Sequence, residues 1–127
     1  MAAHPIVHIE FSATDSKAGA EFYSKLFGWQ TQMADNNYWM FSAEGGPGGG
    51  FNAVGSSLGG GDIKVKPGEV IVYVSTDDIN ATLARVEELG GRTLLGKTEI
   101  GEFGSFAIFA DPTGNQVGLY TSSAQTS

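Results

Sequence analysis

Cysteine is absent from this sequence of 127 residues, and basic residues are scarce. The lack of cysteine excludes disulfide bonds, thiolate nucleophiles and cysteine-ligated zinc. Seven Lys and Arg stand against fourteen Asp and Glu, which gives a formal net charge of −7. Nucleic-acid binding and anionic-membrane binding both depend on clustered basic side chains. The sequence therefore predicts neither a nucleic-acid partner nor a membrane partner.

Long apolar runs and a leader peptide are also lacking. No stretch approaches the roughly 20 consecutive apolar residues that a membrane-spanning helix needs. Residues 1–5 show no basic segment followed by an apolar one, and they lead directly into a strand-like run. We therefore expect a cytoplasmic protein.

The sequence pattern of the first half of the chain predicts one strand, one helix and three further strands. Residues 6–12 alternate, with Val7, Ile9 and Phe11 on one side and His8 and Glu10 on the other, which predicts a half-buried strand. The following capping and apolar residues predict a helix that begins near Asp15 and ends at Gly28, followed by short strands over 29–33, 38–42 and 49–54.

The second half repeats this order. A strand is predicted over 69–75, then a helix that begins near Asp77 and ends at Gly90–Gly91, then strands over 92–97, 103–110 and 115–121. Three pairs of residues match at an offset of 62: Phe11 with Tyr73, Asp15 with Asp77, and Gly28 with Gly90. We predict a duplication within a single domain, residues 1–127, with module one at about 5–54, a linker over 55–68 and module two at about 69–121.

Each predicted sheet has one face covered by its own helix, so its other face must be buried against something else. Two such sheets facing each other would enclose a cleft. In the first strand, Val7, Ile9 and Phe11 are expected beneath the helix, so His8, Glu10 and Ser12 would point into that cleft. The predicted class is α+β, with two tandem βαβββ modules.

This chain resembles the vicinal oxygen chelate superfamily, which includes glyoxalase I, the bleomycin resistance proteins and the extradiol dioxygenases. The resemblance covers roughly residues 5–121 and rests on four segments: 7–11 (VHIEF), 21–29 (EFYSKLFGW), 88–91 (ELGG) and 111–115 (DPTGN). It implies an open, cleft-enclosing mixed β-sheet, the glyoxalase/bleomycin resistance fold. It also implies a homodimer.

The resemblance further implies four positions at which metal-dependent members place their ligands, two in each module. His8 occupies the first position, and the second, near 50–54, holds no His, Asp or Glu. The third falls on Val70 or Ile71, depending on whether Gly90 or Gly91 is paired with Gly28, and the fourth falls on Gly118. Only His8 can donate, so we expect no bound metal and no cofactor.

The leading prediction is a protein that binds a small organic molecule in an aromatic-lined cleft without metal. The predicted ligand-binding residues are Trp39, Phe51, Phe103, Gln116 and Tyr120. Whether Trp39 and Phe41, or instead Tyr38 and Met40, face the helix is left open by the alternation of that strand.

The catalytic candidates are His8 and Glu10, which lie two residues apart on one strand face and could form a loose pair. The simpler interpretation is that His8 has a structural role and that its ring is held by a hydrogen bond. One alternative function is a divalent-metal (Zn, Ni, Mn or Fe) lyase or dioxygenase of glyoxalase type, in which His8 acts with Glu44, Glu69 or Glu102. Another is a non-catalytic regulatory or scaffold subunit.

Overall fold

The computed structural model describes residues 4–34, 38–58 and 62–122. The chain divides into two compact units: a first unit, Val7–Ile71, and a second unit whose described residues are 4–6 and 72–122. Among the described residues, no helix is long and apolar enough to cross a membrane.

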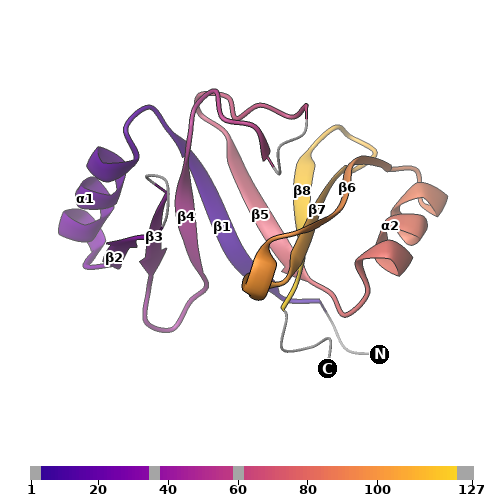
Figure 1. Ribbon diagram of the computed structural model, residues 1–127, viewed down its shortest axis with the longest axis horizontal. Helices are drawn as coiled ribbons and strands as arrows, with labels where there is room; N and C mark the ends of the chain where they lie inside the picture. The colour runs from indigo at the N-terminus through magenta and orange to yellow at the C-terminus, as the bar shows by residue number, and fades with distance from the viewer. Residues whose placement is uncertain (1–3, 35–37, 59–61, 123–127) are drawn as a thin grey trace. The chain divides into compact units, whose positions relative to one another are not determined.

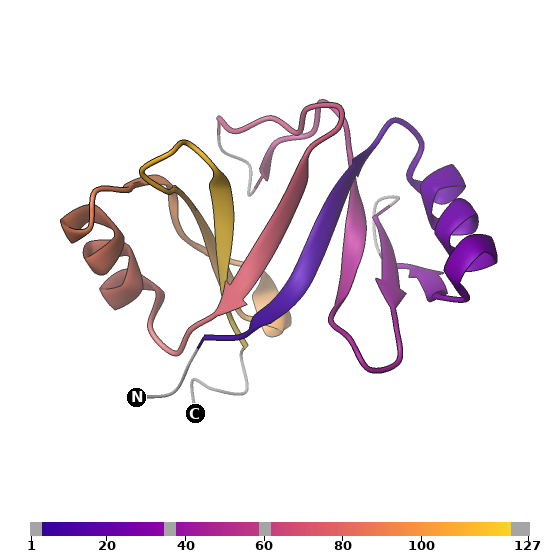
Figure 2. The same cartoon turned by 180° about the vertical axis from the view of Figure 1, so that it is seen from behind.

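The first unit contains β1 (Ile6–Ala13), α1 (Ser16–Phe27), β2 (Gln30–Met33), β3 (Trp39–Ser42) and β4 (Gly48–Ala53). Its strands lie in the order β2-β3-β4-β1. The β1–β4 pair is parallel, as Figures 1 and 2 show from opposite sides, and the other two pairs are antiparallel. This is a βαβββ unit with a mixed sheet.

The second unit contains most of β5 (Val70–Ser75), whose first two residues belong to the first unit. It also contains α2 (Ile79–Glu88), β6 (Arg92–Glu99), the short 3₁₀ helix η2 (Gly101–Phe103), β7 (Ser105–Ala110) and β8 (Gln116–Thr121). Its strand order is β5-β8-β7-β6, with β5 and β8 parallel and the remaining pairs antiparallel. The predicted α+β class with two βαβββ modules is therefore confirmed.

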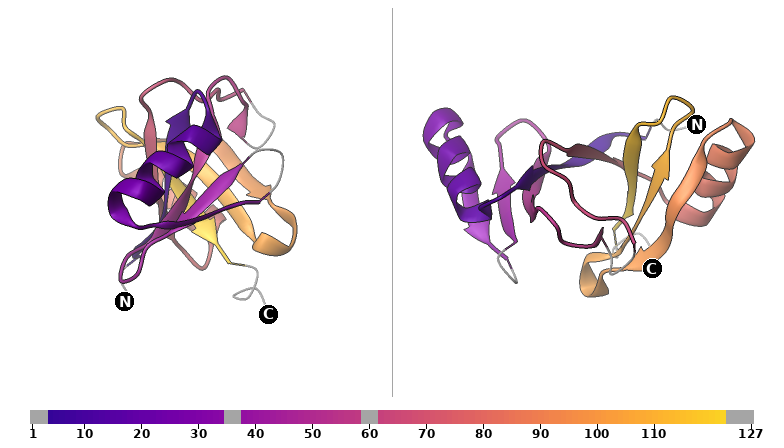
Figure 3. Two further views of the ribbon diagram at one scale, coloured as in Figure 1. Left: turned by 90° about the vertical axis from the view of Figure 1, so that its left-hand side faces the viewer. Right: turned by 90° about the horizontal axis from the view of Figure 1, so that it is seen from above.

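Helix α1 begins and ends where the sequence predicts, and it covers one face of its own sheet (Figure 3, left). The Asp15 side chain accepts a hydrogen bond from the Ala18 amide at 3.0 Å, which satisfies one of the unpaired N–H groups of the first turn. Gly28 ends the helix with a left-handed backbone (φ 77°), and its amide donates to the Ser24 carbonyl.

The core beneath α1 is built largely from aromatic rings. Ala20, Phe41 and Phe51 are buried at its centre, and the partly buried side chains packed on them are Ile9, Phe11, Ala13, Tyr23, Trp29 and Trp39. The predicted orientation of the first strand is confirmed, because Ile9 and Phe11 lie on the helix side of β1.

Helix α2 corrects the predicted offset of the repeat. Its N-cap is Asp78, which accepts from the Ala81 amide at 3.0 Å, so Asp15 matches Asp78 at an offset of 63 and the match with Asp77 is wrong. Val74, not Tyr73, then corresponds to Phe11, and Val74 does pack against the helix-side core of Ile79, Leu83, Ala107 and Leu119. A shift of one residue moves every side chain of a strand to the opposite face.

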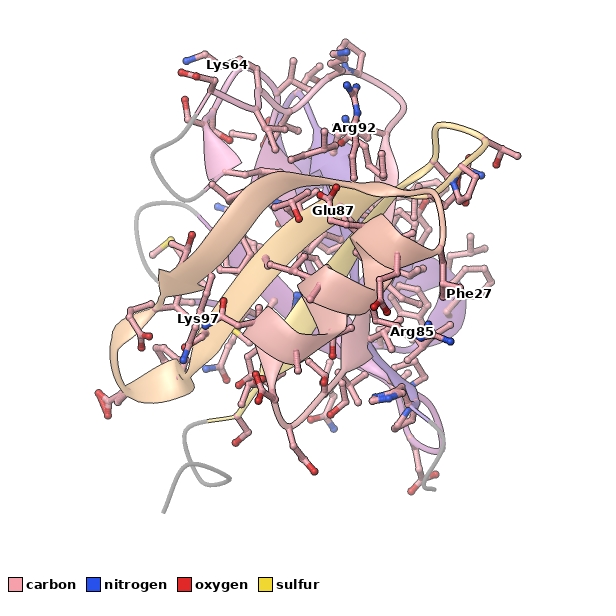
Figure 4. The ribbon with its side chains drawn as sticks, turned by 90° about the vertical axis from the view of Figure 1, so that its right-hand side faces the viewer. Phe27, Lys64, Arg85, Glu87, Arg92 and Lys97 are labelled. Carbon is pink, nitrogen blue, oxygen red and sulfur yellow. The ribbon has the colours of Figure 1, made fainter. Side chains whose placement is uncertain are left out.

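The start of β6 is tied to α2 by a side chain. Glu87 Oε2 accepts a hydrogen bond from the Thr93 amide at 2.7 Å. Figure 4 looks onto this side of the second unit, where Arg85 and Glu87 lie on α2 and Arg92 and Lys97 lie on β6. Arg85 also pairs with Glu88, but both side chains are mostly exposed, so this ion pair contributes little to stability.

Candidate functional site

Polar side chains gather on the face of the first unit's sheet that is turned away from α1. His8 and Glu10 alternate along β1 with Ile9 and Phe11, which belong to the core beneath the helix. Tyr38, just before β3, and Asn52, on β4, meet them on this face. We call these four residues the polar cluster.

The Glu10 carboxylate is the centre of the polar cluster. The Tyr38 hydroxyl donates to its Oε2 at 2.8 Å, and the Asn52 side-chain amide donates to its Oε1 at 2.6 Å. The Glu10 side chain is only 13% exposed. A buried carboxylate needs such donors, because removing it from water is costly unless its charge is hydrogen-bonded.

His8 completes the cluster and is more exposed than Glu10, with a side-chain exposure of 27%. Its Nε2 lies 3.3 Å from Glu10 Oε2 and 3.1 Å from the Tyr38 hydroxyl oxygen. Since the Tyr38 O–H donates to Glu10, the Tyr38 oxygen accepts from His8, which assigns a proton to Nε2. The carboxylate thereby selects the tautomer of the imidazole.

Glycine at position 50 makes room for Tyr38. A methyl group built on Gly50 would overlap the Tyr38 hydroxyl and ring. The strand register places Gly50 directly beside Glu10, so the side-chain space next to the carboxylate is filled by the phenol from a neighbouring strand. Sequence reasoning identified His8 and Glu10 but missed Tyr38 and Asn52 as their partners.

The environment of Tyr38 keeps its hydroxyl protonated. Burial raises the pKa of Tyr38 well above its usual range, and the adjacent Glu10 charge and the hydrogen bond to it act in the same direction. Tyr38 is therefore a constant hydrogen-bond donor to Glu10 at physiological pH.

Two predicted ligand residues lie on the opposite side of this sheet. Trp39 and Phe51 belong to the core beneath α1, where Phe51 is 1% exposed and stacks on Phe11 at 5.7 Å. The predicted position of Phe51 on the uncovered face is wrong. For Trp39, whose orientation the sequence left open, the structure selects the helix side, and Tyr38 takes the other side. Any contact of these two rings with a ligand stays a prediction.

Phe103 was predicted as the first residue of a strand, but it lies outside the observed strand. It ends η2 and is 68% exposed, and β7 begins only at Ser105. Gly101 and Gly104 both have positive φ and interrupt the extended backbone at this point. The Phe103 carbonyl accepts a hydrogen bond from the Tyr120 hydroxyl.

Gln116 and Tyr120 alternate on β8 with Leu119, which packs in the core beneath α2, so both lie on the uncovered face of the second unit as predicted. The Gln116 Oε1 atom is buried, and no hydrogen-bond partner is found for it among the described residues. Gly118 lies between Gln116 and Tyr120 on this face of β8, and the ring of Tyr73 fills the space over it. A role of Gln116 and Tyr120 in ligand binding stays a prediction.

The described side chains do not fit a resident divalent metal. No group of three or more His, Asp or Glu side chains is placed to hold an ion in residues 4–34, 38–58 and 62–122. The offset of 63 assigns the third implied ligand position to Ile71, which is buried and has no donor atom, and the fourth remains glycine. In the first unit, neither Glu44 nor Glu69 joins His8 and Glu10 in such a group.

Sequence relatives of this chain include a candidate glyoxylase and an anthracycline biosynthesis protein. It is 29% identical over 123 residues to CFP32 of Mycobacterium tuberculosis, named as a candidate glyoxylase, covering 88% of this chain and 43% of that protein. It is 30% identical over 128 residues to the anthracycline biosynthesis protein DnrV of Streptomyces peucetius, covering 83% and 42%. The chain thus spans less than half the length of these curated relatives.

Solved structures show the same fold at low sequence identity. A glyoxalase/bleomycin resistance protein/dioxygenase superfamily member from Vibrio splendidus 12B01 matches with a TM-score of 0.63 at 16% identity, over 94% of this chain and 99% of that one. A methylmalonyl-CoA epimerase in complex with methylmalonyl-CoA matches with a TM-score of 0.64 at 18% identity, over 97% of both chains. The resemblance to the vicinal oxygen chelate superfamily is confirmed. The family model of a glyoxalase-like domain matches residues 8–120, and the chain belongs to this family.

Proposed function

We propose that this glyoxalase-like domain binds a small organic molecule on the sheet face that carries the polar cluster, and that it does so without a resident metal. The observation that carries the proposal is the hydrogen-bonded set of His8, Glu10 and Tyr38. Buried polar groups that converge on one face are typical of ligand sites, where they fix the orientation of the bound molecule.

Within this proposal, His8 is the group that contacts the ligand, because it is the more exposed member of its pair with Glu10. An imidazole can donate to or accept from a carbonyl, hydroxyl or amine group. Glu10, Tyr38 and Asn52 act as positioning residues, since Tyr38 and Asn52 donate hydrogen bonds to Glu10, and Glu10 and Tyr38 both lie within hydrogen-bond distance of His8 Nε2. The names of the relatives, which concern glyoxylases and anthracycline biosynthesis, support an organic ligand of low molecular mass.

The test is a fragment screen by NMR on protein freed of metal with a chelator and checked by elemental analysis. We expect fragments that bind the metal-free protein, with His8→Ala weakening them about tenfold, the effect of losing one good hydrogen bond. His4→Ala is the matched control, because His4 instead bonds the Ser75 carbonyl of the second unit. A stoichiometric metal that is lost in His8→Ala would favour the metal-dependent lyase or dioxygenase instead.

A protein that ignores every fragment but captures a specific protein partner would favour the regulatory or scaffold function. The expected homodimer is tested by light scattering on the purified protein. The expected cytoplasmic location is tested by fractionation of the source cells.

A further inference from the structure

A concave feature of the first unit lies away from the polar cluster. It is a cavity of about 590 Å³, a size within the usual range for small-molecule sites. Its walls come from the end of β1, the N-terminal half of α1, the end of β4 and residues 67–70. The lining residues are Phe11, Ser12, Ala13, Thr14, Asp15, Ala18, Gly19, Tyr23, Phe51, Val54, Pro67, Gly68, Glu69 and Val70.

Three aromatic rings line the apolar side of this cavity, of which Phe51 is only 1% exposed and belongs to the core. Phe11 lies 5.4 Å from Tyr23 and 5.7 Å from Phe51, and the three rings are nearly parallel, with interplanar angles of 17° to 23°. Ala13, Val54 and Val70 add aliphatic surface beside them. Such a wall favours a flat or aliphatic hydrophobic body, and aromatic faces also attract cations.

The charged groups of the cavity are all of one sign. Asp15 and Glu69 line it, and none of its lining residues is Lys, Arg or His. The nearest basic residues along the chain, Lys17 and Lys66, are exposed and do not belong to the lining. The net charge of −7 adds a favourable long-range field for a positive ligand.

Both carboxylates are held in place and keep acceptor capacity. Asp15 Oδ1 accepts from the Ala18 amide at 3.0 Å, and Glu69 Oε1 accepts from the Lys66 amide at 3.2 Å. The Glu69 backbone is fixed to Ser12 by two hydrogen bonds, each 2.9 Å long. A carboxylate offers about four lone-pair sites, so one bond to an amide leaves it able to accept an ammonium N–H.

We propose that this cavity binds a hydrophobic amine in its protonated form. The apolar body lies against Phe11 and Tyr23, and the ammonium group pairs with Asp15 and Glu69. This site is separate from the polar cluster, because Phe11 and Phe51 lie on the helix side of the sheet and His8 lies on the other side. The proposal therefore does not depend on the proposed function.

Three probes of one shape and different charge test the proposal: naphthylmethylamine, naphthalenemethanol and naphthoate. Binding is followed by amide chemical shifts of isotope-labelled protein. We expect the amine to bind with shifts at Gly19, Val54 and Gly68, the neutral alcohol to bind roughly fivefold more weakly, as the loss of a partly exposed ion pair predicts, and the anion more weakly still.

Charge-neutral variants of the two carboxylates sharpen the test. Asp15→Asn and Glu69→Gln should each weaken the amine roughly fivefold and leave the alcohol unchanged. Asparagine is also a good N-cap, so Asp15→Asn should preserve α1. Asp78→Asn, at the equivalent cap of α2, is the matched control and should have no effect on binding. His8→Ala should also leave amine binding intact.

Four results would overturn the proposal. They are equal affinity for the amine and the alcohol, no binding of the amine, no response to Asp15→Asn and Glu69→Gln, and loss of amine binding in His8→Ala. The last result would place the amine at the polar cluster, and it would leave the proposed function standing.

Discussion

The two units share the βαβββ order but differ in the sheet face that their helix leaves uncovered. In the first unit this face carries a partly buried carboxylate, Glu10, with His8 and Tyr38 bonded to it. In the second unit the same face carries Tyr73, Phe106 and Ile108, which are 5%, 8% and 0% exposed. The uncovered face therefore carries a polar, hydrogen-bonded cluster in the first unit and buried, mainly apolar side chains at these positions in the second.

In each unit, one glycine makes room for the side chain of a tyrosine. Gly50 accommodates the phenol of Tyr38, whose hydroxyl bonds Glu10, and Gly118 accommodates the ring of Tyr73, which contacts Phe106 at 6.3 Å. In both units a tyrosine occupies the space that a side chain on the last strand would need. The first tyrosine supports a polar site, and the second packs against an aromatic ring.

The largest expected effects lie in the helix-side cores, which are mainly aromatic in the first unit and aliphatic in the second. Phe51→Ala should lower the free energy of unfolding by about 4 kcal/mol and Leu119→Ala by about 3 kcal/mol, since both side chains are almost fully buried. Chemical denaturation followed by fluorescence and by circular dichroism measures both. If either variant kept wild-type stability, that residue would not belong to the core of its unit.

The two glycines should respond differently to an added methyl group. Gly118→Ala forces the buried ring of Tyr73 to move and should cost about 3 kcal/mol, whereas Gly50→Ala displaces mainly the end of the Tyr38 side chain and should cost about 2 kcal/mol, as much as losing the Tyr38 hydroxyl bond to Glu10. Gly96→Ala is the control, because no described atom lies within 4 Å of the new methyl group. Equal costs at positions 50 and 118 would contradict the proposed difference between the two faces.

Removing the Tyr38 hydroxyl should be the next most costly change. Tyr38→Phe leaves the buried Glu10 carboxylate short of a donor and should cost about 2 kcal/mol, whereas Tyr120→Phe removes only a bond to a carbonyl and should cost about 0.5 kcal/mol. Thermal unfolding of the two variants checks the difference. Similar small costs would mean that Glu10 does not depend on Tyr38.

Because the pKa of Tyr38 is raised, the free energy of unfolding should also depend on pH in the alkaline range. The unfolded chain releases the Tyr38 proton near pH 10, below the pKa of the folded state, so the stability that this group contributes is complete below pH 10 and is lost as the pH rises further. Tyr38→Phe should therefore show a shallower alkaline loss of stability than Tyr120→Phe. An identical alkaline slope in the two variants would be the contrary result.

The smallest expected effect lies in the turn between β7 and β8. Hydrogen bonds from the Asn115 side chain, the Asn115 backbone and Thr113 lower the pKa of Asp111 to about 2. The contribution of Asp111 is complete above about pH 4 and is lost as the pH falls toward about 2. As the pH falls from about 4 to about 2, Asp111→Ala should lose less stability than wild type or the control variant Asp77→Ala. The melting temperature of each protein, measured as a function of pH, checks this.

The sequence predicted features that depend on local pattern. The alternation of β1 placed Ile9 and Phe11 beneath the helix and His8 and Glu10 on the other face, because a strand side chain follows the period of two wherever it pairs. The start of α1 near Asp15 was equally local, since the capping residues Thr14, Asp15 and Ser16 stand directly before the apolar helical pattern.

The remaining features depend on choices that local pattern does not decide. Asp77 and Asp78 are equally suitable caps, and the choice between them reverses the face of Tyr73 and Val74. Tyr38 and Asn52 reach Glu10 only through the pairing of β3 with β4 and of β4 with β1, which is tertiary information. The break before β7 at Phe103 depends on the backbone conformations of Gly101 and Gly104.

The central claim is that the polar cluster of the first unit binds a small organic molecule without metal. Its most direct test is a titration of metal-free, isotope-labelled protein with a fragment from the screen, followed by amide chemical shifts in wild type and His8→Ala. The claim predicts shifts at β1, β3 and β4 of the first unit that disappear in His8→Ala. Shifts confined to the second unit, or binding that appears only when a divalent metal is added, would contradict it.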